Sequence, residues 1–202
     1  MRPLPYSFYA RPARQVAADL LGKRLVRSLD GLRISGIIVE TEAYCDAREP
    51  DLACHGDRTN KGRPTKRTAV MFGPAGHAYV YFTYGMHWMF NVVTGRTGEA
   101  NAVLVRALEP AEGMEVMRSL RNRKDAELTN GPAKLAQALA INKKFNGTNL
   151  CNRDGFIWIE EGTRTAPEDV VTGPRIGLGQ TPEPWFSLPW RYWIRDNPHV
   201  SR

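Results

Sequence analysis

The sequence predicts an α+β fold with a largely antiparallel sheet. The candidate strands and helices do not alternate along the chain as the units of a parallel sheet would. Two pairs of strand-like segments are instead joined by turn signals, at Asp30-Gly31 and at Gly85-Met86, as in antiparallel hairpins. The 202 residues contain no repeat, linker or low-complexity tract, so we expect residues 1–202 to form a single domain.

The composition is that of an ordinary globular protein. Hydrophobic residues make up 42% and charged residues 24% of the chain, whose net charge is +7 and whose pI is about 9.5. The positive charge permits an anionic partner such as nucleic acid but does not establish one.

The sequence also gives an expected location. No apolar run approaches the roughly 20 residues of a membrane span, and the N-terminus lacks the apolar core of a signal peptide. Three cysteines do not make a disulfide framework. We therefore expect an intracellular protein that does not enter a membrane, in the cytoplasm or nucleoid of a bacterium or in the nucleus of a eukaryote.

The first quarter of the chain predicts a helix followed by a β-hairpin. Apolar residues share one face of a helix over residues 11–21. A short strand over 24–29 then leads through the turn into a long strand over 32–44. On that strand Glu40 and Glu42 share one face among apolar residues, where a carboxylate is costly unless it is paired or used. Two interpretations stay open: an edge strand with a solvated acidic face, or functional carboxylates.

Residues 45–76 predict a long irregular segment that is polar and interrupted by Gly and Pro. Its cations are Arg58, Lys61, Arg63, Lys66 and Arg67. Such a cluster can bind the phosphates of a nucleic acid, although most charge runs are solvated loops. Loops of this length are often functional or mobile.

Residues 78–93 predict a second hairpin, rich in aromatic residues. Alternation along its first strand puts Tyr79 and Tyr81 on one face and Tyr84 on the other. The tyrosines are candidates either for a core with hydroxyls at its rim or for stacking on a nucleic-acid base. Asn91, on the returning strand, is either a hydrogen-bonded core amide or a specificity contact.

The remainder of the chain predicts further strands and two helices. Residues 101–108 form a strand that carries Arg106, and Glu109-Pro110 is expected to end it and to begin a helix. A second helix is expected over residues 133–141, where Lys134 near the helix start is a candidate phosphate contact, although an ordinary helix start explains it equally. Further strands are expected at 156–160, 170–176 and 191–195.

Several kinds of chemistry lack their usual motifs. Cys45, Cys54 and His55, with His77 or His87, do not have the spacing of a zinc site, so we expect no metal. Nucleotide-binding glycine loops and the serine-hydrolase elbow are absent too. The remaining set is a carboxylate-bearing strand, a tyrosine-rich hairpin and basic segments. It fits hydrolysis at a sugar carbon of a nucleic acid.

The sequence resembles the alkyladenine (3-methyladenine) DNA glycosylases of the animal and bacterial type. The segments that carry the resemblance are Glu40-Thr41-Glu42-Ala43-Tyr44, Tyr79-Val80-Tyr81, Tyr84-Gly85-Met86, Asn91-Val92, Arg106-Ala107-Leu108-Glu109-Pro110, Gly131-Pro132-Ala133-Lys134-Leu135, Ala140-Ile141-Asn142-Lys143 and Arg175-Ile176-Gly177. They follow one another across most of the chain. The resemblance implies a curved, largely antiparallel sheet core flanked by helices and no cofactor.

The resemblance also implies a monofunctional mechanism, in which water cuts the N-glycosidic bond without a covalent lysine intermediate. It makes Glu42, rather than Glu40, the general base that activates this water. The Arg106 side chain and the backbone carbonyl of Ile176 would help to hold the water. The product would be an abasic site, as in base excision repair.

The remaining implied roles concern the flipped base. Tyr44 and Tyr81 would sandwich the base together with His55, which would also contact the base edge. Asn91 would crowd the 2-amino group of guanine. Tyr84 would insert into the duplex where the base has left.

The implied partner is double-stranded DNA that contains alkylated or otherwise damaged purines, bound by a monomer. Arg58, Lys61, Arg63, Lys66 and Lys134 are the expected phosphate contacts. One alternative is a noncatalytic module that binds damaged or single-stranded DNA through the same aromatic and basic residues. Another is a hydrolase of free nucleosides, against which the basic segments argue.

Overall fold

The computed structural model describes residues 1–44, 51–58 and 63–201. The strands in this part of the chain are β1 Arg24–Leu29, β2 Leu32–Tyr44, β3 Ala78–Thr83, β4 His87–Thr94, β5 Asn101–Glu112, β6 Ile157–Glu160, β7 Val170–Gly173 and β8 Arg191–Ile194. The α-helices are α1 Tyr6–Tyr9, α2 Ala13–Asp19, α3 His55–Arg58, α4 Met114–Arg121 and α5 Pro132–Ala138. The described residues also include the 3₁₀ turns η2 Ala69–Phe72, η3 Asp125–Glu127, η4 Lys143–Phe145 and η5 Pro167–Asp169.

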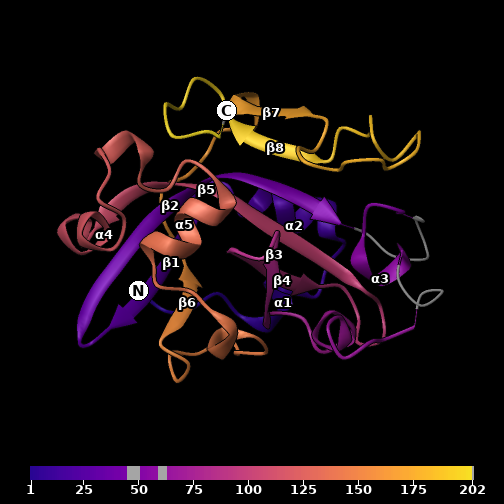
Figure 1. The fold of residues 1–202 in the computed structure, drawn as a ribbon, viewed down its shortest axis with the longest axis horizontal. Coiled ribbons are helices and arrows are strands. Elements are labelled where there is room, and N and C mark those ends of the chain that lie inside the picture. Colours follow the sequence, from indigo (N-terminus) through magenta and orange to yellow (C-terminus); the bar gives the residue numbers. More distant parts are fainter. Residues whose placement is uncertain (45–50, 59–62, 202) are drawn as a thin grey trace.

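The strands form one antiparallel sheet that curls into a half-barrel (Figure 1). Its order is β3-β4-β5-β2-β1-β6, while β8 pairs with β2 and β7 pairs with β8. Every pairing between these strands is antiparallel. The α+β class expected from the sequence is therefore confirmed.

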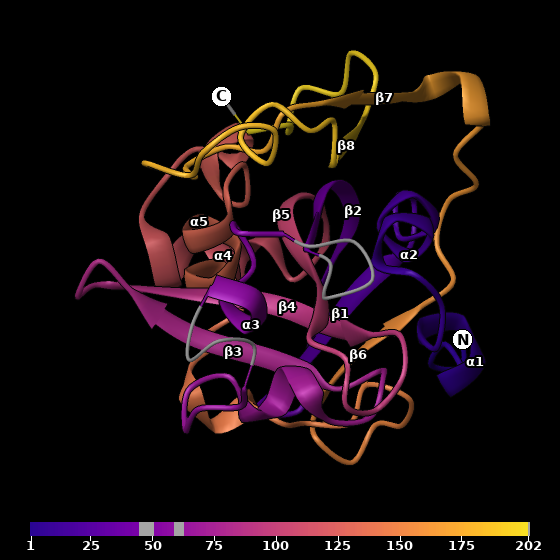
Figure 2. The same cartoon turned by 90° about the vertical axis from the view of Figure 1, so that its right-hand side faces the viewer.

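Helices cover the sheet on both sides. Helix α2 packs against β2 and β5, and α5 packs against β4 and β5. Figure 2 shows α2 and α5 on opposite sides of β2 and β5. The fully buried Leu20, Ile38, Phe90, Leu108 and Leu135 belong to one core cluster, which joins both helices to the sheet. This core anchors the central strands, from which the candidate site residues project.

Both predicted hairpins are present. The β1–β2 turn has positive φ angles at Asp30 (51°) and Gly31 (80°), which a type I′ turn requires and which asparagine, aspartate and glycine tolerate best. The β3–β4 hairpin extends from the body of the molecule, and its turn carries Tyr84 at a φ of 52° (Figure 2).

Three boundaries predicted from the sequence are wrong. The strand expected over 170–176 ends at Gly173, and the helix expected over 133–141 ends at Ala138. The third lies in β5. Glu109-Pro110 does not end the strand, because β5 continues to Glu112 and α4 begins only after Gly113. Pro110 lies opposite Gly36, next to a register shift between Ser35 and Gly36. A proline is tolerated in a strand at such an irregularity, because its missing N–H is not needed for the ladder.

A second irregularity lies in the middle of the β2–β5 pair. Glu40 lies opposite Ala107 and Thr41 lies opposite Val105, so Arg106 has no partner residue on β2. Bulges of this kind change the direction of a side chain and are common next to active sites. Here the bulge brings the Arg106 side chain to the same carboxylates that alternation places on one face of β2.

Candidate active site

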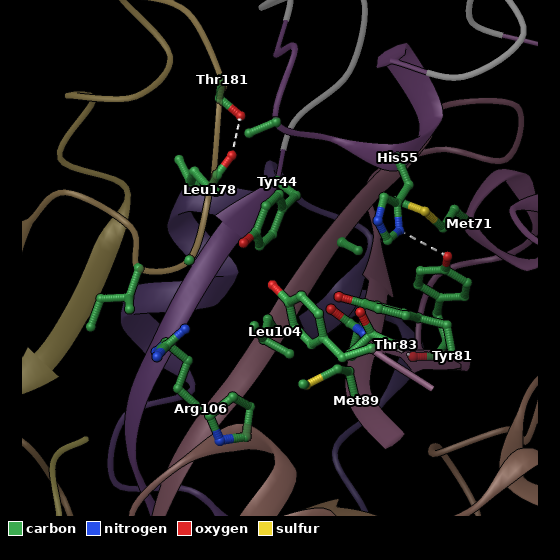
Figure 3. A pocket seen from close by; sticks show the side chains of 18 residues that line it. Tyr44, His55, Met71, Tyr81, Thr83, Met89, Leu104, Arg106, Leu178 and Thr181 are labelled. Atoms are coloured by element: carbon green, nitrogen blue, oxygen red, sulfur yellow. Dashed lines mark hydrogen bonds between the residues drawn. The ribbon is translucent and has the colours of Figure 1, made fainter. Parts of the chain in front are cut away.

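A cavity of about 310 Å³ lies between the curled sheet, His55 at the start of α3, and residues 176–181 (Figure 3). It is lined by Tyr44, Ala53, His55, Met71, Tyr79, Tyr81, Thr83, Tyr84, Met89, Asn91, Ala102, Leu104, Arg106, Pro132, Ile176, Gly177, Leu178 and Thr181. Seven of the eight residues to which the sequence assigned catalysis, base binding or intercalation thus line one cavity. The eighth, Glu42, contacts the lining residues Tyr44, Arg106 and Ile176.

Glu42 is fully buried and is held by three groups that themselves line the cavity. Its Oε1 accepts a hydrogen bond from the Ile176 backbone N–H at 2.7 Å and lies 3.1 Å from Nη1 of Arg106. Its Oε2 accepts a hydrogen bond from the Tyr44 hydroxyl at 2.9 Å. A carboxylate has about four acceptor positions, so this set fixes Glu42 without saturating it. Ile176 therefore contacts Glu42 through its N–H group, whereas the resemblance assigned a role to its carbonyl.

Glu40 is also fully buried, and it binds Nε of Arg106, whereas Glu42 binds Nη1 of the same guanidinium. Its Oε1 accepts hydrogen bonds from Nε of Arg106 at 3.0 Å, Nε of Arg191 at 2.6 Å and the Ser201 hydroxyl at 2.9 Å. Its Oε2 accepts one from the Ser201 backbone N–H at 2.7 Å. The interpretation of this strand as an edge with a solvated acidic face is therefore wrong. Strand β2 is central, and both carboxylates are paired.

Arg106 thus lies between two carboxylates. Burial by itself lowers its pKa, but the charges of Glu42 and Glu40 outweigh that effect and raise the pKa above the usual value of an arginine. The guanidinium stays charged and gives Glu42 a fixed orientation. It also lines the cavity, where it can contact a bound molecule (Figure 3).

Aromatic rings form the walls around the cavity. The rings of His55 and Tyr81 pack edge to face, with their centres 4.7 Å apart (Figure 3). Nδ1 of His55 lies 3.2 Å from the Tyr79 hydroxyl oxygen. Burial raises the pKa of Tyr79 to about 12, against the opposing charge of Arg67, and burial also raises the pKa values of Tyr44 and Tyr81. These phenols are therefore neutral at pH 7, and the faces of Tyr44 and Tyr81 that line the cavity are available for stacking.

The two candidate specificity residues of the β3–β4 hairpin have different environments. Asn91 is buried at the cavity wall, and its side-chain amide donates a hydrogen bond to the Tyr79 carbonyl at 3.0 Å, which fixes the amide in place. Tyr84 lies at the tip of the hairpin and is 75% exposed. Asn91 is thus held by a hydrogen bond at the cavity wall, while Tyr84 is exposed at the hairpin tip.

The five candidate phosphate contacts are only partly described. Arg63 and Lys66 are exposed in the segment before η2. Lys134 is half-buried in α5 and donates a hydrogen bond to the Asn130 side chain at 2.8 Å, two residues from Pro132 of the cavity wall. Arg58 ends α3, but its side chain is not described, and Lys61 lies outside the described residues.

Sequence reasoning missed a buried ion pair that joins two cavity segments. Arg175 and Asp51 are both fully buried and form two hydrogen bonds, of 2.6 and 2.9 Å. Burial alone lowers the pKa of Arg175, but its bonds to Asp51 raise the pKa above the usual value. Asp51 also accepts a hydrogen bond from the N–H of Ala53 on the way to His55, and Arg175 directly precedes Ile176. No local sequence signal connects residues 124 positions apart.

Other features bear on the alternatives considered from the sequence. Among the described residues, no group of three or more His, Cys, Asp or Glu side chains is arranged to hold a metal ion. Cys45 lies outside the described residues, and Cys54 is buried with its thiol 3.3 Å from the Ala100 carbonyl. Within the described ranges, no helix has the length and apolar character needed to cross a membrane.

Comparison with known proteins gives the family. The sequence matches the methylpurine-DNA glycosylase family over residues 7–198. It is 49% identical over 200 residues to a protein of Carboxydothermus hydrogenoformans, with 98% of each chain covered. It is 48% identical to a protein of Myxococcus xanthus, and the match covers all of this chain and 95% of that relative. It is 46% identical to a protein of Methanocella arvoryzae, and the match covers all of this chain and 97% of that relative. Each relative carries the name "Putative 3-methyladenine DNA glycosylase". With a family match over nearly the whole chain and relatives of this similarity, the protein belongs to the methylpurine-DNA glycosylase family.

Proposed function

We propose that this protein is a monofunctional DNA-3-methyladenine glycosylase that takes a damaged purine out of duplex DNA and hydrolyses its N-glycosidic bond. Residues 1–202 act as one glycosylase domain, working as a monomer on double-stranded DNA. The observation that carries the proposal is the fixed, buried carboxylate of Glu42 behind a cavity walled by tyrosines. The family membership supports the same activity.

The size and walls of the cavity suit a flipped base. Its 310 Å³ lies at the lower end of the range for small-ligand pockets, about 300–1,000 Å³. Tyr44 from β2 and Tyr81 from β3 present neutral ring faces between which a purine can stack. His55 reaches the same space from the start of α3 and contacts the edge of the base.

The reaction needs a base for water and a stable leaving group. Alkylation at N3 or N7 makes the purine cationic, so the electron pair of the C1′–N bond leaves with the base, which becomes neutral. The sugar is then oxocarbenium-like, and the carboxylate of Glu42 stabilises this charge. The oxygen of a water molecule bonds to C1′, and the water proton passes to Glu42. Arg106 and the Ile176 backbone hold Glu42 in the direction that this transfer requires.

Binding to the duplex uses the groups around the mouth of the cavity. Tyr84 inserts into the stack in place of the extruded nucleotide, whose flipping costs a few kcal/mol. Arg58, Lys61, Arg63, Lys66 and Lys134 contact phosphates. Asn91, fixed by its bond to Tyr79, crowds the position that the 2-amino group of guanine would occupy.

The test is a panel of duplexes, each with one defined lesion, incubated with the protein and then treated with alkali to cleave abasic sites. We expect strand cleavage at damaged purines with the wild-type protein. Glu42→Gln keeps the shape of the side chain but removes the base. It should retain lesion binding and lower the single-turnover rate by about 10²- to 10⁴-fold.

The matched control is Glu168→Gln, the same change at an exposed glutamate in η5, which should cleave like the wild type. Base release by Glu42→Gln at the wild-type rate would refute the assignment of Glu42. Lesion binding without release by the wild type would favour a noncatalytic module. Hydrolysis of free nucleosides but not of duplexes would favour a nucleoside hydrolase.

A further inference from the structure

Both tyrosines that would hold the base have an arginine over the ring. The Cζ atom of Arg175 lies 4.8 Å from the centre of the Tyr44 ring, and Cζ of Arg67 lies 5.0 Å from the centre of the Tyr81 ring. Tyr44 and Tyr81 line the cavity, whereas neither arginine does (Figure 3). Each guanidinium therefore lies behind a wall of the cavity, on the side away from a bound base.

We propose that Arg67, and to a smaller extent Arg175, set the charge preference of the base pocket by weakening its attraction for cationic purines. The inference rests on the proposed function, since it concerns which damaged bases that pocket accepts. Two observations support the inference: the contacts of the two arginines with the tyrosine rings, and the different environments of the two arginines.

The physical reason is competition for the same π electrons. An aromatic ring attracts a cation through the negative charge on its face. A guanidinium on one face draws that charge toward itself, so the opposite face attracts a second cation less. A base stacked at about 4.5 Å from the ring centre would lie about 9–10 Å from the guanidinium, within roughly one Debye length, so the two positive charges also repel. A neutral purine of the same shape experiences neither effect.

Arg67 should have the larger influence because its charge is less compensated. Arg175 is fully buried and paired through two hydrogen bonds with Asp51, which cancels most of its field. Arg67 is exposed and hydrogen-bonds to the Tyr79 side chain, and no carboxylate in the described part of the chain forms an ion pair with it. Within the described part of the chain, the Tyr81 wall is therefore backed by a net positive charge.

The consequence is a pocket that selects by shape more than by charge. Tyrosine walls alone would favour lesions that carry a positive charge, such as adenine methylated at N3. With Arg67 behind Tyr81 this preference is smaller, so neutral damaged purines compete for the same cavity. Arg67 is thus a specificity residue that acts through Tyr81 and does not touch the base.

The test compares two lesions that differ only in charge. One duplex carries 3-methyladenine, which is cationic in DNA, and the other carries 3-methyl-3-deazaadenine, its neutral analogue. Affinities are measured with Glu42→Gln, in which base release is about 10²- to 10⁴-fold slower, with and without Arg67→Gln. Arg67→Gln should raise the preference for the cationic lesion about two- to five-fold, the range that cation–π energies at an exposed arginine imply. Arg67→Lys, which keeps the charge, should restore a preference close to the original one.

Lys66→Gln is the matched control, because it removes a charge one residue away that lies over no ring described in the structure. It should weaken binding to both duplexes equally and leave their ratio unchanged. An unchanged ratio in Arg67→Gln would overturn the inference while leaving the proposed function intact. If the protein with native Arg67 bound neither lesion better than adenine, the proposed function itself would fail, and the inference with it.

Discussion

Asp51→Asn should destabilise the protein strongly, although Asp51 is not among the residues assigned to catalysis. The substitution keeps the size of the side chain but removes the negative charge that compensates Arg175. Both side chains are fully buried, and the Arg175 guanidinium also donates to the Ala43 carbonyl at 3.0 Å and to the Trp185 carbonyl at 3.1 Å. These carbonyls hold the guanidinium in place, so the uncompensated charge stays buried.

The magnitude follows from that burial. Removing one partner of a buried ion pair typically costs about 3–5 kcal/mol. For a protein of this size one kcal/mol corresponds to about 2–4 °C in Tm, so the expected decrease is roughly 6–20 °C. The loss should also lower glycosylase activity, because Asp51 and Arg175 lie in the segments that carry His55 and Ile176 into the cavity.

Urea denaturation and thermal unfolding measure the effect, and the chain supplies a control. Arg118 and Asp125 form a pair with the same two-bond geometry, at 2.7 and 2.9 Å, but both side chains are about half exposed. Asp125→Asn should leave the urea midpoint close to the wild-type value, because exposed pairs contribute little. Adding Arg175→Met to Asp51→Asn should recover part of the lost stability, since the unpaired charge is then gone. Equal losses in Asp51→Asn and Asp125→Asn would refute the reasoning.

Three further predictions concern the contacts with DNA. The logarithm of the affinity for undamaged duplex should fall with the logarithm of the salt concentration, with a slope of roughly −0.9 per phosphate neutralised. Replacing Arg63, Lys66 and Lys134 together by Gln should make that slope less steep by about 2.7. An affinity that does not depend on salt would exclude nucleic acid as the partner. Asn91→Ser should raise the single-turnover rate on guanine-type lesions relative to adenine-type lesions, because the smaller side chain no longer clashes with the 2-amino group of guanine. An unchanged ratio of these rates would contradict the role of Asn91. Tyr84→Ala should reduce flipping of all lesions alike, as reported by a fluorescent base, and an intact flipping equilibrium would show that Tyr84 is not the wedge.

Local patterns in the sequence predicted most of the strands. The alternation over residues 32–44 and the turn at Asp30-Gly31 correspond to β2 and its hairpin with the expected bounds, and the aromatic hairpin over residues 78–93 corresponds closely to β3 and β4. Such patterns depend on neighbouring residues only, so a single sequence contains them. The error at Pro110 has the opposite cause. Whether a proline ends a strand depends on the partner strand, here at Gly36.

The sequence by itself determined which carboxylate face, which tyrosines and which basic segments were available to the site. Only the tertiary structure decided how they are held. Glu40 is compensated by Arg191 and Ser201, which are 151 and 161 residues away, and Arg106 reaches both carboxylates through a bulge defined by two strands together. Asp51 and Arg175 likewise meet only when the chain has folded. The reason is physical: a buried charge is tolerated only beside a partner, and folding brings that partner from a distant part of the chain that no local pattern specifies.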